Sequence, residues 1–204
     1  MSKYPVIIFE GIEASGKTTN INIVAKYLKR KKKKFIKFRE PGGSKYSEII
    51  RKLILNKNSK LNFKTDLFLL MASRSENVDK IIKNNLKKKI ILIDRFTDST
   101  LAYQHYGMGI NLKLIENMNK FVLGKFKPDL TFISIVNKIN MKKRLNLRKN
   151  INKYDKFKYS FYDKVQKGFL NISKINKNYI IVDSNNKKIK ENSKLILKKI
   201  DKLI

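Results

Sequence analysis

The sequence predicts a three-layer α/β fold, in which a five-stranded parallel sheet carries helices on both faces. Five short runs rich in β-branched residues are almost continuously apolar, as strands buried on both faces of a sheet are. Segments with helical spacing of apolar residues lie between these runs. Strands that alternate with helices build a parallel sheet with right-handed crossovers. At 204 residues, the chain is expected to form a single domain over residues 1–204.

The expected strands and helices follow one another along the chain. The strands are 6–10, 35–39, 90–94, 130–136 and 179–183. A first helix is expected over 19–28, and the basic run 29–34 would meet the negative end of its dipole. Further helices are indicated by three apolar faces, formed by Leu114, Met118 and Phe121, by Val165, Phe169 and Ile172, and by Ile189, Ile196, Ile200 and Leu203.

The chain is strongly basic, with a formal net charge of +32. Such a charge favours contact with nucleic acid or other polyanions. The lysines, however, are spread over nearly every segment and are not gathered into one groove. We therefore expect a solvated basic surface that steers phosphate substrates, and a nucleic-acid partner is not expected.

Cysteine is absent from the sequence, which excludes disulfides and thiolate metal sites and fits a reducing compartment. No apolar stretch approaches the ~20 residues that a membrane helix needs. The N-terminus also lacks the features of a signal peptide. These observations predict a cytoplasmic protein with no membrane partner.

A phosphate-binding loop joins the first expected strand to the first expected helix. The stretch Gly11-Ile12-Glu13-Ala14-Ser15-Gly16-Lys17-Thr18 matches the pattern G-x-x-x-x-G-K-[ST] of P-loop NTPases. Its glycines let backbone N–H groups point at a triphosphate at the N-terminus of the next helix. Lys17 would neutralise the β- and γ-phosphates, and the Thr18 hydroxyl would bind Mg²⁺. The expected ATP-binding residues here are Gly11, Glu13, Ala14, Ser15, Gly16, Lys17, Thr18 and Thr19.

A carboxylate is expected to face this loop from a neighbouring strand. Asp94 ends the expected strand 90–94, and ligands of parallel sheets bind at the carboxyl ends of the strands. Asp94 is thus the second expected Mg²⁺ ligand, beside Thr18. In the alternative interpretation, Asp94 only caps the turn that follows.

Several classes of protein carry such a loop. A GTPase would need a guanine-reading motif such as N-K-x-D, and the nearest stretch, Asn137-Lys138-Ile139-Asn140, lacks the carboxylate. Helicase-like ATPases need a longer chain. A small-molecule kinase and a basic nucleic-acid-binding ATPase remain as alternatives.

Three further stretches carry a resemblance to one family. They are FREPGG (38–43), DLFLLMASRSE (66–76) and DRFTDSTLAYQ (94–104). Together with the phosphate loop, in this order and spacing, they closely resemble thymidylate kinases of the bacterial type, and FKPDLTF (126–132) fits the same family. The resemblance covers nearly the whole chain. It implies a P-loop nucleoside-monophosphate-kinase fold, a homodimer, and phosphate transfer from ATP to dTMP with Mg²⁺ as cofactor.

The resemblance also implies an acceptor site for dTMP. Arg95 would bind the dTMP phosphate as a fork of donors, with Arg39 and Arg51 approaching the same group. Arg74 would donate hydrogen bonds to thymine. The other implied contacts are Thr100 and Gln104 with the base, Tyr103 with the deoxyribose, Glu13 with the sugar 3′-hydroxyl, and a cis bond between Glu40 and Pro41.

The segment 146–158 has no sustained apolar face and is expected to form a short flexible lid, although an ordinary exposed helix junction fits as well. Some relatives place a catalytic arginine in the phosphate loop, where this chain has Ala14. The transition-state cation is therefore expected from the lid region, from Arg144, Arg148 or Lys153. In the alternative interpretation, Arg144 stacks on adenine. The expected catalytic residues are Lys17, Asp94, Arg95, Arg148 and Lys153.

The sequence departs from the family pattern at two positions. The lid motif D-R-[hydrophobic]-[DE] reads Asn152-Lys153-Tyr154-Asp155, so a lysine without the planar fork replaces arginine. Leu70 stands where an aromatic ring is expected to stack on thymine. A kinase for another deoxynucleotide or for a deoxynucleoside remains an alternative, but Arg39, Arg74 and Arg95 together favour an acceptor that already carries a phosphate.

Overall fold

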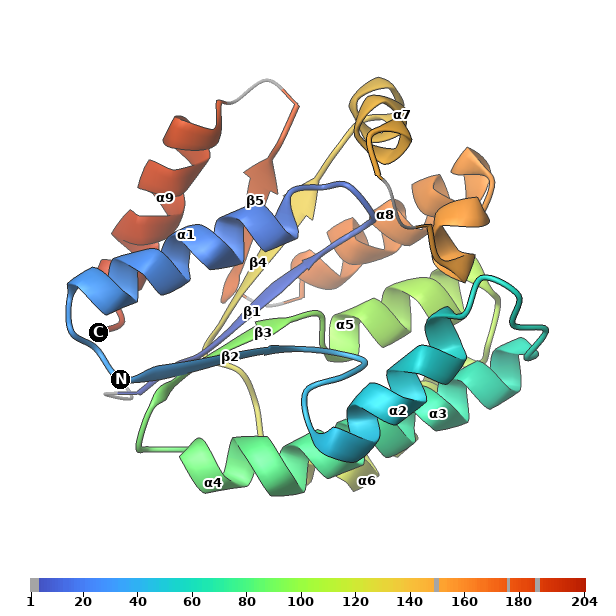
Figure 1. The fold of residues 1–204 in the computed structure, drawn as a ribbon, viewed down its shortest axis with the longest axis horizontal. Helices are drawn as coiled ribbons and strands as arrows, with labels where there is room; N and C mark the ends of the chain where they lie inside the picture. Colours follow the sequence, from blue (N-terminus) through green and yellow to red (C-terminus); the bar gives the residue numbers. More distant parts are fainter. Residues whose placement is uncertain (1–3, 149–150, 176, 186–187) are drawn as a thin grey trace.

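A computed structural model gives the chain a parallel five-stranded sheet with helices on both faces (Figure 1). The structure describes residues 4–148, 151–175, 177–185 and 188–204. The strands are β1 (Val6–Gly11), β2 (Phe35–Arg39), β3 (Ile90–Asp94), β4 (Leu130–Ile135) and β5 (Tyr179–Asp183). Their order in the sheet is β2-β3-β1-β4-β5, and every pairing is parallel. The predicted fold class is confirmed, and each strand begins where the sequence predicts.

The helices lie between the strands. They are α1 (Lys17–Arg30), α2 (Lys45–Leu55), α3 (Phe63–Asn77), α4 (Lys83–Asn85), α5 (Thr97–Thr100), α6 (Leu112–Leu123), α7 (Lys138–Asn146), α8 (Tyr159–Ser173) and α9 (Ile189–Asp201). Two π-helical stretches, η1 (Val78–Ile82) and η2 (Leu101–Gly107), and a short 3₁₀ turn, η3 (Lys153–Lys156), complete the set. Side-chain caps start several helices: Ser44 caps α2 and Asn62 caps α3, each by accepting a backbone N–H three residues on.

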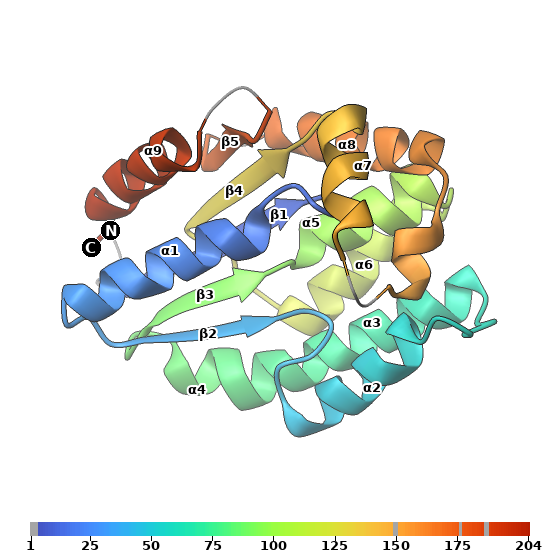
Figure 2. The ribbon, with the colours of Figure 1, turned by 45° about the horizontal axis from the view of Figure 1, so that its top comes forward.

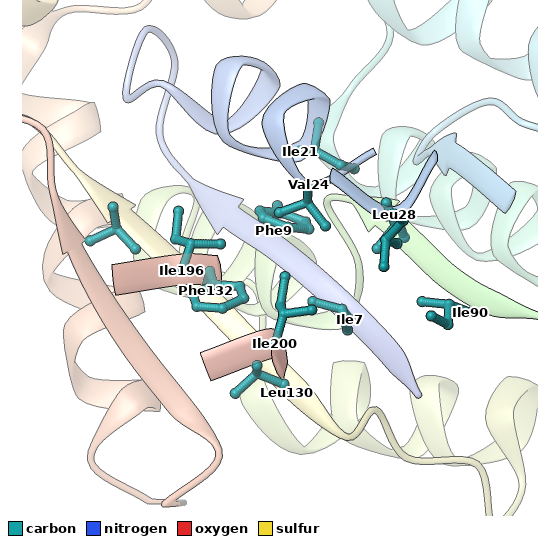
Figure 3. Packing of buried hydrophobic residues seen from close by; sticks show 12 residues of the cluster. Ile7, Phe9, Ile21, Val24, Leu28, Ile90, Leu130, Phe132, Ile196 and Ile200 are labelled. Carbon is teal, nitrogen blue, oxygen red and sulfur yellow. The ribbon is translucent and has the colours of Figure 1, made fainter. Parts of the chain in front are cut away.

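Helices α1 and α9 cover one face of the sheet. Ile7 and Phe9 of β1 pack there against Val24 and Leu28 of α1 and against Ile200 of α9 (Figure 3). All of these side chains are fully buried. This packing holds α1 across the sheet, with its N-terminus at the carboxyl ends of the strands (Figure 2).

The opposite face of the sheet is covered by α3–α4, α6 and α8. Val6 and Ile8 of β1, whose side chains alternate with those of Ile7 and Phe9, pack against Val78 and Ile82 of η1. Near β4, Val165, Phe169 and Ile172 of α8 are buried together, as their spacing predicts.

The apolar face expected on α6 is only partly buried, through Met118, which packs against Ile115 and its neighbours. Phe121 is 90% exposed and Leu114 is 48% exposed, while the neighbouring Ile115 is fully buried. Asn119 is also buried, because it takes part in a polar contact described below. The apolar spacing thus identified a helix but not the side of it that meets the core. Ile189, which was expected on the buried face of α9, is likewise 64% exposed, whereas Ile196 and Ile200 are buried.

The lid that the sequence predicts spans 146–158, of which residues 149–150 lie outside the described residues. Within the described ranges, no helix is long and apolar enough to cross a membrane.

Candidate active site

The phosphate-binding loop, residues 11–18, connects β1 to the N-terminus of α1. Lys17 folds back over it, and its Nζ donates to the carbonyl oxygens of Gly11 at 2.9 Å and Ile12 at 2.7 Å. Burial lowers the pKa of Lys17 to about 7, and repulsion by the nearby Arg95 adds to this effect. A phosphate anion would favour the charged form of this lysine, so the loop is arranged to gain from binding one.

Position 11 requires a glycine for two reasons. Its φ of 136° is a conformation that other residues rarely adopt. A Cβ at this position would also lie 2.2 Å from the carbonyl oxygen of Ser134 on β4. The close approach of β1 and β4 therefore fixes the start of the loop.

The strand register gathers the charged residues at one edge of the sheet. Asp94 at the end of β3 is paired in register with Arg39 at the end of β2 and with Phe9 of β1. The Thr18 hydroxyl donates to Asp94 Oδ2 at 3.4 Å. The two expected metal ligands therefore lie together beside the loop.

The donor set at this position fits Mg²⁺. Mg²⁺ is usually held by one or two protein oxygens, with substrate phosphates and waters completing its shell. A hydroxyl and a carboxylate provide such oxygens. Clusters of three or more His, Cys, Asp or Glu side chains, which would suit other metals, do not occur in the described part of the chain.

A cavity of about 200 Å³ opens next to the loop. It is enclosed by the carboxyl ends of β2 and β3, by α2, α3 and η2, and by Asn152 and Tyr154 near η3. Most of the expected site residues line it: Glu13, Lys17, Thr18, Arg39, Arg51, Leu70, Arg74, Asp94, Arg95, Thr100, Tyr103, Gln104 and Arg148. The other expected site residues do not line it: Gly11, Ala14, Ser15 and Gly16 of the loop, Thr19 of α1, Arg144 and Lys153.

Arg95 connects the phosphate loop to the cavity. Its guanidinium donates to the Gly11 carbonyl at 2.9 Å and forms an ion pair of 2.8 Å with Glu13. Its Cζ lies 5.1 Å from the centre of the Tyr103 ring, and the Tyr103 hydroxyl donates to Glu13. Arg95, Glu13 and Tyr103 thus form one contact group, in which each side chain limits the orientation of the other two.

Glu10 orients the backbone around Arg95, a role that the sequence motifs do not reveal. Its carboxylate is fully buried and accepts hydrogen bonds from the backbone N–H of Phe96 at 2.7 Å and from the hydroxyl of Ser99 at 2.5 Å. Burial raises the pKa of Glu10 to about 7, and the neighbouring Asp98 contributes to the rise. A charged residue inside an otherwise apolar strand is the sequence signal that could have pointed to Glu10.

Three arginines bring positive charge to the same part of the cavity. Arg51 donates to the Pro41 carbonyl at 2.7 Å, and Glu40–Pro41 is a cis bond, as expected. Burial lowers the pKa of Arg51 to about 10, and the charges of Arg39 and Arg95 contribute to this shift. Cations that repel one another across a cavity are stabilised by an anion placed between them. The arrangement suits a phosphate group.

Arg74 lies deeper and is held on three sides. Its Nε donates to Glu40 at 2.8 Å, and its terminal nitrogens donate to Asn119 at 2.7 Å and to Thr100 at 2.9 Å. The guanidinium has five N–H groups, so this anchoring leaves donors for a ligand. Gln104 is also buried at this end of the cavity, and Leu70 contributes an apolar wall.

Arg144 reaches the phosphate loop from α7. It donates to the carbonyl oxygens of Ala14 at 3.0 Å and Ser184 at 2.7 Å. The hydroxyl of Ser184 donates in turn to the Ser15 carbonyl at 2.7 Å. Arg144 therefore connects the backbone of the phosphate loop at Ala14 to the residue that follows β5.

The two expected lid cations have different surroundings. Arg148 lines the cavity and forms an ion pair of 2.6 Å with Asp155. Lys153 instead points to α3, where its Nζ lies 2.6 Å from Asp66 Oδ2. Direct contact of Lys153 with a transferring phosphate stays a prediction, and in this arrangement its charge is directed elsewhere.

Known proteins resemble this chain in sequence and in fold. The thymidylate kinase family model matches residues 9–196. The thymidylate kinase of Thermosipho africanus (strain TCF52B) is 38% identical over 179 residues, which are 87% of this chain and 88% of that protein. That of Wolbachia pipientis wMel is 42% identical over 170 residues, 82% of this chain and 84% of the relative. The crystal structure of thymidylate kinase from Ehrlichia chaffeensis is 33% identical, with a TM-score of 0.79, and the match covers 97% of this chain and 98% of that one.

The chain belongs to the thymidylate kinase family. It is therefore an enzyme, and the family resemblance carried by the four motifs is confirmed. The three-layer fold with a parallel sheet is shared with the solved thymidylate kinase.

Several residues of this thymidylate kinase family site have supporting roles that the motifs do not predict. They support the motif residues from other elements: Glu10, Glu40, Asp66, Ser99 and Asn119. Glu40, Asp66 and Ser99 lie inside the family motifs, whereas Glu10 ends an apolar run and Asn119 lies on α6. The fold shows which groups each of them contacts.

Proposed function

We propose that this protein transfers the γ-phosphate of ATP to dTMP and so forms dTDP, in the synthesis of dTTP. One observation carries the proposal: residues of the phosphate-binding loop and three arginines, Arg39, Arg51 and Arg95, line the same cavity. Two anionic nucleotides can meet there end to end. Family membership supports thymidine monophosphate as the acceptor.

The side chains supply position and charge for an in-line transfer. The loop amides and Lys17 would hold the donor phosphates, while Arg95, Arg39 and Arg51 would hold the acceptor phosphate. Mg²⁺, bound by Thr18 and Asp94, would supply positive charge to the donor phosphates. Phosphoryl transfer depends mainly on such positioning and charge neutralisation.

The deeper part of the cavity would hold the base and the deoxyribose of dTMP. The free donors of Arg74, with Thr100 and Gln104, would read thymine, and Leu70 would pack against the ring. Tyr103 would lie against the deoxyribose and disfavour a 2′-hydroxyl, and Glu13 would accept from the 3′-hydroxyl. Arg144 would contact the adenine of the donor nucleotide.

A coupled ADP-release assay over a panel of nucleoside monophosphates tests the proposal. We expect turnover with dTMP well above that with dUMP, dCMP and AMP, and dependence on Mg²⁺. An enzyme that leaves dTMP unchanged in the presence of ATP and Mg²⁺ would contradict the function. Release of ADP that requires single-stranded DNA and no monophosphate would instead support the nucleic-acid ATPase alternative, with the steep salt dependence of phosphate contacts.

We further propose that the protein forms a homodimer through α3 and α6. These helices pack on each other and carry exposed large apolar side chains. On α3, Phe68 is 63% exposed, and on α6, Phe121 and Leu114 are 90% and 48% exposed. Clustered exposed apolar residues mark interaction surfaces.

Sedimentation equilibrium of the wild type and of Phe121→Glu tests the dimer. We expect a dimeric wild type and a shift of the variant toward monomer, with the exposed control Ile139→Glu on α7 unchanged. A monomeric wild type at micromolar concentration would refute this assembly. The cytoplasmic location expected from the sequence stays a prediction.

A further inference from the structure

Asp66 and Lys153 form an ion pair that joins α3 to the turn η3. The Nζ of Lys153 lies 2.6 Å from Asp66 Oδ2, and the two side chains are 11% and 0% exposed. Asp66 lies in the first turn of α3. The contact therefore links the helix that carries Arg74 to the turn that carries Asp155.

The buried carboxylate depends on this lysine. Burial raises the pKa of Asp66, and Lys153, together with the side chain of Tyr154, opposes that shift. A buried charge whose partner is removed is strongly destabilised. Loss of either partner would therefore leave an uncompensated charge between α3 and η3.

Asp66 shares a helix face with residues of the acceptor site. Asp66, Leu70 and Arg74 are spaced at i, i+4 and i+8, which places them one above another on α3. Leu70 and Arg74 line the cavity. Asp66 therefore ends the same row of side chains at the η3 side.

The turn η3 connects the Asp66–Lys153 ion pair to Arg148. Asn152 and Asp155 form a capping box, in which the Asn152 side chain accepts from the Tyr154 N–H at 2.8 Å and Asp155 Oδ2 accepts from the Asn152 N–H at 3.0 Å. The other carboxylate oxygen of Asp155 pairs with Arg148 at 2.6 Å. Arg148 is thus held by a turn that is itself held by Asp66.

We propose that Asp66 is a positioning residue for phosphoryl transfer: through Lys153 and η3 it places the guanidinium of Arg148 at the cavity. The inference rests on the proposed function, since it assigns a role in that same reaction. It also assigns Lys153 to the support of Arg148, whereas the family motif would have it contact the transferring phosphate.

A set of variants separates these roles. Asp66→Asn removes the charge and keeps the shape, Lys153→Met removes the cation and keeps the stem, and Lys153→Arg retains the charge. Lys158→Met, at an exposed lysine of the same segment, is the control. Each is assayed for kcat and KM with dTMP and ATP, and each is checked for folding by its thermal midpoint.

We expect Asp66→Asn and Lys153→Met to lower kcat by about tenfold each, as misplacement of a charged group does, with KM for dTMP nearly unchanged. The double variant Asp66→Asn with Lys153→Met should be no slower than either single variant. Lys153→Arg should keep the wild-type kcat. In an Arg148→Ala background, Asp66→Asn should have no further effect on kcat, because the group it positions is gone.

Other outcomes would overturn the inference. If Lys153 contacts the transferring phosphate itself, Lys153→Met lowers kcat and Asp66→Asn does not. If the pair only stabilises the fold, the thermal midpoint falls while kcat of the folded enzyme is unchanged. A wild type without dTMP kinase activity would instead refute the proposed function.

The apolar double variant Asp66→Leu with Lys153→Met covers the case in which single variants fail to fold. Replacing a buried ion pair by apolar residues of similar size is often tolerated. This variant should fold, and it should have the reduced kcat of the single variants if the charge pair positions Arg148. Wild-type kcat in this variant would exclude the positioning role.

Discussion

Arg74 and Glu40 form an ion pair of 2.8 Å in which both side chains are almost fully buried, at 2% and 4% exposure. Glu40 precedes the cis bond to Pro41 at the end of β2, and Arg74 lies on α3. Burial raises the pKa of Glu40, while the charge of Arg74 and a hydrogen bond from Asn77 oppose the shift. The arginine proposed to contact the base is therefore oriented by a carboxylate that has no other role in the proposed reaction.

Glu40→Gln should weaken both the fold and the binding of dTMP. The amide keeps the shape but leaves the charge of Arg74 without its buried counterpart, which costs about 3 kcal/mol of unfolding free energy. We also expect a higher dTMP dissociation constant, because Arg74 loses its orientation. Urea denaturation and dTMP titration measure the two effects.

The control for this substitution is Asp79→Asn. Asp79 pairs with Lys83 one helical turn away, and both side chains are more than half exposed. An exposed pair of this kind contributes less than about 0.5 kcal/mol, so the control should have wild-type stability and dTMP affinity. Equal effects of the two substitutions would contradict a special role for Glu40.

The titration of Lys17 should appear in the pH dependence of stability. Its pKa is about 7 in the folded protein, against 10.5 for an ordinary solvated lysine. Between these pH values the unfolded chain binds more protons, so Lys17 makes the unfolding free energy rise as pH increases from 7 toward 10.5. The free energy of unfolding is measured by denaturation of the wild type and of Lys17→Met across this pH window. The wild-type curve should rise more with pH, and the difference between the two curves is the contribution of Lys17.

ATP should reverse this shift of the Lys17 pKa. Because phosphates favour the charged lysine, ATP binding at about pH 8.5 should take up about one proton per site. Calorimetric titration in two buffers of different ionisation enthalpy measures the uptake, and Lys26→Met, at an exposed lysine of α1, is the control that should retain it. Binding without proton uptake would mean that Lys17 is already charged in the free enzyme.

The strands and the phosphate loop were predictable because their signals are local. A continuous apolar run and a spaced glycine–lysine motif need no knowledge of the rest of the chain. The supports of Arg74 were not predictable, because Glu40 is 34 residues away and Asn119 is 45 residues away, on different elements. The apolar face expected on α6 is buried only in part for a related reason: Asn119 is buried at its contact with Arg74, and Phe121 is exposed.

Arg148→Ala should lower kcat by at least about tenfold, the low end for the loss of one transition-state cation. Arg148 lines the cavity and is held by Asp155, so it is placed to meet charge that develops on the transferring phosphate. Steady-state assays at saturating ATP and dTMP measure the change. The exposed Lys142→Ala on α7 serves as the control, and a wild-type kcat in Arg148→Ala would remove this arginine from the transfer step.

Leu70→Phe should tighten dTMP binding. Leu70 is half-buried and lines the cavity one helical turn before Arg74, so a ring at this position would lie beside the base that Arg74 is proposed to contact. Aromatic stacking adds about 1 kcal/mol beyond area burial, which corresponds to about a fivefold lower dissociation constant. Calorimetric titration with dTMP measures it, with Leu53→Phe, at an exposed position of α2, as the control. A weaker affinity would mean that the cavity is too full for the ring and that leucine at position 70 fits this site better than an aromatic residue does.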